Sequence, residues 1–265
     1  MINFILKFGK INTEIGRLLR YRFLLGKHAY DTVIGKLLKR ILEYHNSGKY
    51  QKRDRELGRM FMLIKHLRSI ENYDDSLLKC FRKEIKRADT TDGFYGTRFE
   101  INIAASLIQK DILFKKQESP DFIVYYNSSE IGIECGSTRI RKEVDNPDLY
   151  YKIGSTINSK TRKPYSDSST SLFIDMTNLI HSILKAEGRP NFDKIREKVK
   201  SSINNNDFGS VILFTYLYMD SKSRFESNYI RVNNSDINKE LNHFLNIYYN
   251  KGEHNVRDFD IPWEG

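Results

Sequence analysis

The chain has 265 residues, 39% of them hydrophobic, which suffices for one large domain or two small ones with ordinary packed cores. No stretch approaches the roughly 18 apolar residues of a membrane-spanning helix, and the amino terminus lacks the features of a signal peptide. We therefore expect a cytoplasmic protein without a membrane partner. Cys80 and Cys135 are too few for a disulfide framework or a zinc cluster, so both are expected to be reduced and buried.

The net charge of +10 is unevenly distributed along the chain. Residues 1–90 contain 21 Lys and Arg against 10 Asp and Glu, a net +11, whereas residues 91–265 contain 23 against 24, a net −1. A basic module beside a nearly neutral one favours an element that holds a polyanion such as a nucleic acid. The alternative is that the Lys-rich helices are merely solvated.

Residues 1–90 are interpreted as a basic α-helical module. Apolar residues recur at helical spacing throughout this region, which predicts four helices with Lys and Arg on their outer faces. Asn46-Ser47-Gly48 indicates a turn, and the Asp and Ser residues of 72–76 offer caps for a helix from about Ser76 to Arg87.

The sequence "DTTDGFYGTRFE" marks a change of character, and residues 91–265 are interpreted as a second, α/β domain. "TRFEINIAASLIQKD" predicts a helix followed by a short strand at "ILFKK". "DFIVYY" and "EIGIECGS" predict two strands of a hairpin joined by the turn residues Asn127-Ser128-Ser129. A helix in 146–163, the strand "SLFIDM", a helix over 191–203, the strand "GSVILFTYLYM" and a helix over 236–249 complete a mixed β-sheet flanked by helices.

Two carboxylates are expected to meet on this hairpin. Side chains alternate faces along a strand, so Glu134 points away from the layer that Ile133 and Cys135 share. Asp121 opens the preceding strand at the end where the hairpin brings it beside Glu134. Neighbouring carboxylates repel, and a divalent cation with hard oxygen ligands relieves the repulsion, so magnesium fits this pair.

A third acid lies on the preceding helix. Glu100 follows Phe99 at the edge of the apolar stripe and is expected to face the sheet. With Glu100, Asp121 and Glu134 together, a bound metal would activate a water and neutralise charge on a phosphate.

This combination resembles the core of the PD-(D/E)XK nuclease superfamily, the restriction-endonuclease-like fold. The resemblance covers about residues 93–218 and rests on Glu100 in "GTRFEINIAASL", Pro120-Asp121 in "SPDF", Glu134 in "IGIECGS" and the order of elements around them. It implies that Asp121 and Glu134 bind Mg²⁺, with Mn²⁺ as a substitute. By the same resemblance Glu100 is an accessory ligand and the carbonyl of Cys135 also ligates the metal.

The chain departs from the family pattern at one position. The motif continues Glu-X-Lys, but the third position here is Gly136. Lys160 is the best physical replacement, because it continues the helical stripe of Ile153 and Ile157 that should face the sheet. Burial of a lysine there would need an anionic partner. Three further basic residues are weaker candidates: Lys152, Arg139 and Lys142.

The expected activity is hydrolysis of DNA phosphodiester bonds by a Mg²⁺-dependent endonuclease of restriction or phage-defence type. Two alternatives stay open: a catalytically inactive nucleic-acid-binding protein of the same fold, and a scaffold whose amino-terminal helices pair with a partner subunit. The sequence does not distinguish DNA from RNA. Cutting both strands of a duplex favours a homodimer.

Overall fold

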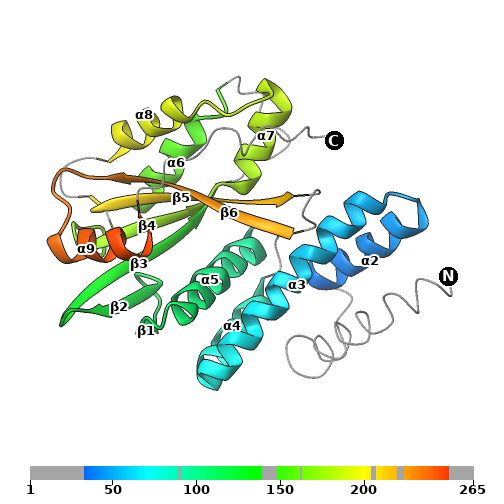
Figure 1. Ribbon diagram of the computed structural model, residues 1–265, viewed down its shortest axis with the longest axis horizontal. Helices are drawn as coiled ribbons and strands as arrows, with labels where there is room; N and C mark the ends of the chain where they lie inside the picture. The colour runs from blue at the N-terminus through cyan, green and yellow to red at the C-terminus, as the bar shows by residue number, and fades with distance from the viewer. Residues whose placement is uncertain are drawn as a thin grey trace. The chain divides into compact units, whose positions relative to one another are not determined.

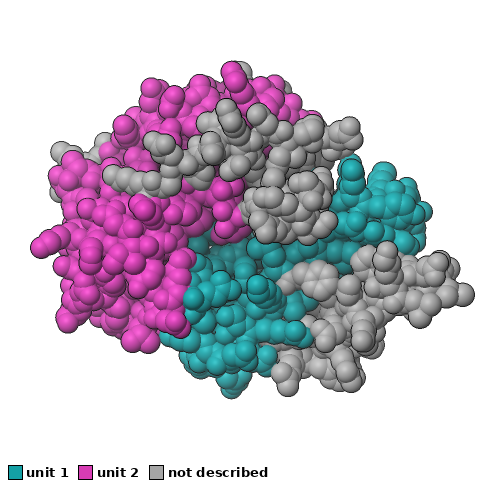
Figure 2. Space-filling view, in the orientation of Figure 1, with its two compact units in different colours: residues 1–109, 220–225 teal, residues 110–219, 226–265 magenta. Residues whose placement is uncertain are grey.

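The computed structural model describes residues 33–88, 91–138, 148–161, 163–203, 207–219 and 224–250. The chain divides into two compact units, residues 1–109 with 220–225 and residues 110–219 with 226–265 (Figure 2). The division falls at the end of helix α5 (Thr91–Gln109), whereas the change in composition placed it at the start of that helix. The reason is packing, because α5 lies against the helices that precede it.

The first unit is helical. It contains α2 (Val33–Asn46), α3 (Tyr50–Tyr73) and α4 (Asp75–Arg87) together with α5, and α3 contacts the other three. These helices confirm three of the four predicted in this region, and the first of the four lies outside the described residues. Asp74 caps α4 by accepting a 2.7 Å hydrogen bond from the backbone N–H of Ser76.

The second unit contains a six-stranded mixed sheet, which confirms the predicted α/β class (Figure 1). Its strands lie in chain order. The first strand pairs with the second and the second with the third in antiparallel fashion, whereas the third pairs with the fourth and the fourth with the fifth in parallel. The strands are β1 (Phe114–Lys116), β2 (Phe122–Tyr126), β3 (Ser129–Ser137), β4 (Thr170–Asp175), β5 (Ser210–Met219) and β6 (Arg224–Asn233).

The β2–β3 hairpin closes through two residues, Asn127 and Ser128, with φ of +46° and +62°. Positive φ at both central positions is the geometry of a tight hairpin turn whose twist matches the flanking strands. The predicted turn therefore fixes the hairpin register, which pairs Phe122 with Ile133.

Helices cover both faces of the sheet (Figure 1). One face packs against α6 (Tyr151–Lys160), α7 (Thr177–Glu187) and α8 (Phe192–Ser202), whose apolar residues share a core with Leu172 and Ile174 of β4. The opposite face carries α9 (Lys239–Tyr248) and an aromatic cluster that includes Phe173. All six residues of β4 are buried, which confirms its predicted central position.

Three features differ from the sequence-based expectations. Helix α7 was missed because it follows β4 almost directly, so its apolar residues continue the run of the strand. Strand β6 was missed because three consecutive polar residues, Glu226, Ser227 and Asn228, interrupt the apolar pattern that would predict a strand. Cys80 is exposed on α4 rather than buried, whereas Cys135 is buried as expected.

None of the helices in the described part of the chain has the length and apolarity required to cross a membrane.

Candidate active site

The hairpin register places Asp121 across from Glu134. Since Phe122, the first residue of β2, pairs with Ile133, the residue just before the strand lies opposite Glu134. The backbone N–H of Cys135 donates a 2.7 Å hydrogen bond to Oδ2 of Asp121, which fixes this carboxylate at β3. The structure therefore brings Asp121 and Glu134 together, and Cys135 joins them through its backbone.

Glu134 lies on the face of the sheet that α6 covers. Its side chain is only 4% exposed, and its cross-strand neighbour on β4 is Leu172, a member of the apolar core. A carboxylate buried among such groups requires hydrogen-bond donors or a cation. Two donors reach Oε1 of Glu134: Nζ of Lys160 at 2.5 Å and the hydroxyl of Tyr165 at 3.0 Å.

Lys160 comes from the last turn of α6. Ile153 and Ile157 on the same helix are fully buried against the sheet, and Lys160 continues their stripe as the helical spacing predicted. A Cβ built on Gly136 would lie 3.9 Å from Cε of Lys160, which is ordinary van der Waals contact. The lysine side chain therefore passes beside the position where the PD-(D/E)XK pattern has its own lysine.

The electrostatics of the cluster keep Lys160 protonated. Burial alone would lower the pKa of its ammonium group, but the hydrogen bond to Glu134 and the charges of Glu134 and Asp121 outweigh burial and raise it above the usual value. Burial, followed by the charge and hydrogen bond of Glu134, raises the pKa of Tyr165 to about 12. At neutral pH both groups are therefore donors rather than bases.

One oxygen of Glu134 is left over. Oε2 is buried and has no hydrogen-bond partner among the described residues. An anionic oxygen without a donor is a ligand for a hard cation, and Asp121 supplies a second carboxylate close by. The two acids therefore fit a divalent metal of the Mg²⁺ type.

Glu100 lies in a different compact unit from Asp121 and Glu134. It lies on α5 in the first compact unit and is half-buried. The ranges that the structure describes contain no group of three or more His, Cys, Asp or Glu side chains able to hold a metal ion. The accessory role of Glu100 stays a prediction, as does ligation by the carbonyl of Cys135.

Tyr165 was missed by the sequence interpretation. It lies in the loop between α6 and β4, which has no periodicity to show where a side chain points. The loop is held by Asp167, whose Oδ1 accepts hydrogen bonds from the backbone N–H and the hydroxyl of Ser169 at 2.9 and 2.7 Å. A turn of this kind before a buried strand is a local signal that the loop is ordered.

Of the weaker lysine replacements, Lys152 lies over the ring of Tyr151, with Nζ 5.2 Å from the ring centre. Arg139 and Lys142 lie outside the described residues.

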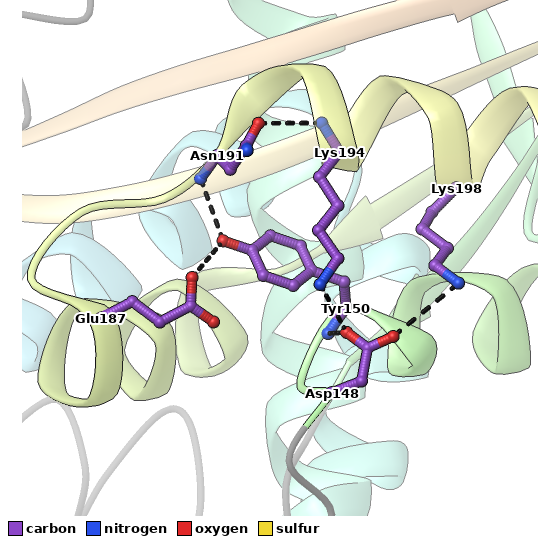
Figure 3. A network of polar contacts seen from close by, with 6 residues as sticks. All are labelled: Asp148, Tyr150, Glu187, Asn191, Lys194 and Lys198. Carbon is purple, nitrogen blue, oxygen red and sulfur yellow. Dashed lines mark hydrogen bonds and ion pairs between the residues drawn. The ribbon is translucent and has the colours of Figure 1, made fainter.

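A polar network anchors the amino-terminal end of α6 (Figure 3). The hydroxyl of Tyr150 donates to Oε2 of Glu187 at 2.8 Å and accepts from the backbone N–H of Asn191 at 2.9 Å. Next to it, Asp148 forms a 3.0 Å ion pair with Lys194. These contacts tie the start of α6 to the end of α7 and the start of α8, and so hold the helix that carries the site lysine.

Comparison of the chain with protein-family models, with curated proteins and with solved structures found no match.

Proposed function

We propose that the protein is a metal-dependent nuclease that hydrolyses phosphodiester bonds in DNA. The observation that carries the proposal is the contact of Lys160 with Glu134 beside Asp121. Two carboxylates and a lysine are the residue types of the PD-(D/E)XK centre, and here they meet although the lysine is absent from its motif position.

Each side chain has a distinct role in this proposal. Asp121 is oriented by the N–H of Cys135, and Oε2 of Glu134 has no donor among the described residues, so these two carboxylates would hold Mg²⁺. When bound, the ion supplies Lewis-acid charge neutralisation and lowers the pKa of a bound water.

Lys160 acts as a cation and a hydrogen-bond donor. Its raised pKa excludes a role as general base near neutral pH, because the deprotonated form is too scarce. Its ammonium group would instead orient the attacking water and stabilise the negative charge that develops on the phosphate oxygens. Tyr165 would act through Glu134, by holding that carboxylate in one orientation.

A second candidate function is a nucleic-acid-binding protein without catalytic activity. It is supported by the same ion pair, because Lys160 already neutralises Glu134, and by the absence of a third metal-ligating side chain next to the pair within the described ranges. Activity separates the two candidates directly.

The test is a plasmid-nicking assay with the purified full-length chain. We expect Mg²⁺ or Mn²⁺ to support nicking, EDTA to stop it, and Asp121→Asn to lower the rate about 10²-fold or more, because one anionic ligand is lost while the Cys135 contact can persist. If wild type and Asp121→Asn nick equally, the activity does not come from this site. If the wild type binds DNA but never nicks it, the second function is the correct one.

A further inference from the structure

Helix α4 of the first unit carries a stripe of positive charge, which we call the α4 stripe. Its members recur at intervals of three and four residues, so they share one side of the helix. They also line one open hollow in the protein surface. The α4 stripe consists of Lys79, Arg82, Lys83, Lys86 and Arg87.

The charge of the α4 stripe is almost unbalanced. Within the described residues, the only ion pair made by any member joins Lys79 to Asp75 at 2.6 Å, and both side chains are more than 60% exposed, so the pair is weak. Arg82 is half-buried, and the remaining three members are exposed. The stripe therefore presents most of its charge to solvent.

Helix stability does not account for the stripe. Its members face one another as like-charged neighbours three and four positions apart, an arrangement that destabilises a helix. Lys86 and Arg87 lie in the last turn, where cations complement the helix dipole, but Lys79, Arg82 and Lys83 lie before it. A partner with negative charges would offset the repulsion.

The spacing of the stripe suits a nucleic-acid backbone. Arg87 lies eight positions after Lys79, so the stripe is about 12 Å long at 1.5 Å per residue. Phosphates of one DNA strand are spaced about 3.4 Å apart along the helix axis, so this length spans about three or four of them. A lipid surface is a poorer match, because the apolar side of α4 is buried and leaves no face to enter a bilayer.

We infer that the α4 stripe is a docking surface for the phosphate backbone of duplex DNA. This inference deepens the proposed function and rests on it for the choice of DNA as the polyanion. Backbone contacts of this kind give affinity and register but no sequence preference.

The experiment measures binding of a fluorescent DNA duplex to the full-length protein in buffer with EDTA, so that no cleavage is needed. The stripe variant carries Lys83→Gln, Lys86→Gln and Arg87→Gln. The control variant carries Lys185→Gln, Arg189→Gln and Lys200→Gln, three exposed residues of the second unit with the same loss of charge. Thermal unfolding of both variants verifies that they are folded.

We expect the stripe variant to bind about tenfold more weakly at moderate salt. The slope of log affinity against log salt should fall by about 0.9 for each lost contact, and the control should bind nearly as the wild type does. Equal weakening of both variants would overturn the inference, because net charge alone would then explain it. Poly-glutamate serves as a second polyanion without phosphates. The inference would also be overturned if the stripe variant kept its affinity for DNA but lost its affinity for poly-glutamate.

The outcome is independent of nuclease activity. Loss of DNA binding by the stripe variant supports the docking surface even if the wild type never nicks a plasmid. Conversely, the wild type could nick DNA while the stripe variant binds DNA as tightly as the wild type does. That result would refute the docking surface but would not contradict the proposed active site.

Discussion

Glu134 is a buried carboxylate with two donors on one oxygen and none, among the described residues, on the other. A purely structural ion pair in an apolar setting is expected to satisfy both oxygens, because an unsatisfied charged acceptor is costly. The asymmetry is what a ligand site requires: one oxygen is held in place while the other stays available. Tyr165 contributes to this arrangement, since its hydroxyl and the ammonium group of Lys160 share Oε1.

The contact of Tyr165 with Glu134 should affect how the stability of the protein changes with pH in strongly alkaline solution. An unfolded tyrosine loses its proton near pH 10, but the folded protein holds it to about pH 12, because burial and the charge of Glu134 raise the pKa. Between these values the unfolded state binds fewer protons than the folded state, so stability falls as the pH rises. The raised pKa of Lys160 acts in the same direction.

We therefore expect Tyr165→Phe to lose less stability than the wild type between pH 10 and 12, as measured by thermal unfolding at a series of pH values. Tyr125, which is 48% exposed on β2, provides the matched control, and Tyr125→Phe should decline with pH as the wild type does. An equally steep decline in Tyr165→Phe would mean that the hydroxyl is not held by Glu134 in solution.

At the scale of elements, helix α6 supplies the lysine that strand β3 lacks. The strand has Gly136 where the PD-(D/E)XK pattern has lysine, and the helix brings Lys160 to the same place. The backbone of β3 leaves room for a side chain at Gly136, since the nearest atom to a built Cβ is 3.7 Å away. The lysine can therefore be moved from the helix to the strand by mutation.

Lys160→Ala should lower the nicking rate about 10²-fold, because the charge that forms on the phosphate loses its cation. It should also reduce the free energy of unfolding by about 1–3 kcal/mol, because Glu134 loses a donor. Adding Gly136→Lys to this variant should raise its nicking rate about tenfold above that of Lys160→Ala alone, because an ammonium group is returned to Glu134.

Lys163, an exposed residue just after α6, is the control, and Lys163→Ala should change stability by less than about 0.5 kcal/mol. A purely structural role for Lys160 predicts a different pattern, in which Gly136→Lys recovers stability without recovering the rate.

The elements that the sequence predicted well are those with strong local signals. Asp74 caps α4 and Asn191 caps α8, so both helices begin close to where the capping residues indicated. The hairpin turn at Asn127 set the register that brought Asp121 to Glu134. By contrast, α7 was not separated from β4, because only one residue, Met176, lies between the two elements and the apolar run of the strand continues into the helix. The local signal at this point is Asp175, whose Oδ1 accepts a 2.9 Å hydrogen bond from the backbone N–H of Thr177.

At the scale of the whole molecule, the sequence predicted two parts of different character, and the structure contains two compact units. The position of the division was not predictable from charge, because α5 is less basic than the helices before it and yet packs with them. Lys160 was predictable from helical spacing, whereas Tyr165 was not, because a loop residue has no period. The grouping of Glu100 with the other acids depends on long-range geometry that no local pattern contains, and it stays a prediction.

The two units also divide the proposed work. The carboxylate pair and its lysine lie entirely in the second unit, and the α4 stripe lies in the first. Chemistry and backbone binding should therefore be separable by mutation, with each set of variants affecting one property.

The most direct test compares two identical substitutions on strand β3, Glu134→Gln and Glu130→Gln, in the plasmid-nicking assay with Mg²⁺. Glu134 is buried at the site, whereas Glu130 is exposed four residues earlier on the same strand. We expect Glu134→Gln to lower the nicking rate by about 10²-fold or more and Glu130→Gln to leave it within about twofold of the wild type. A folded Glu134→Gln protein that nicks DNA at the wild-type rate would contradict a hydrolytic centre at this carboxylate.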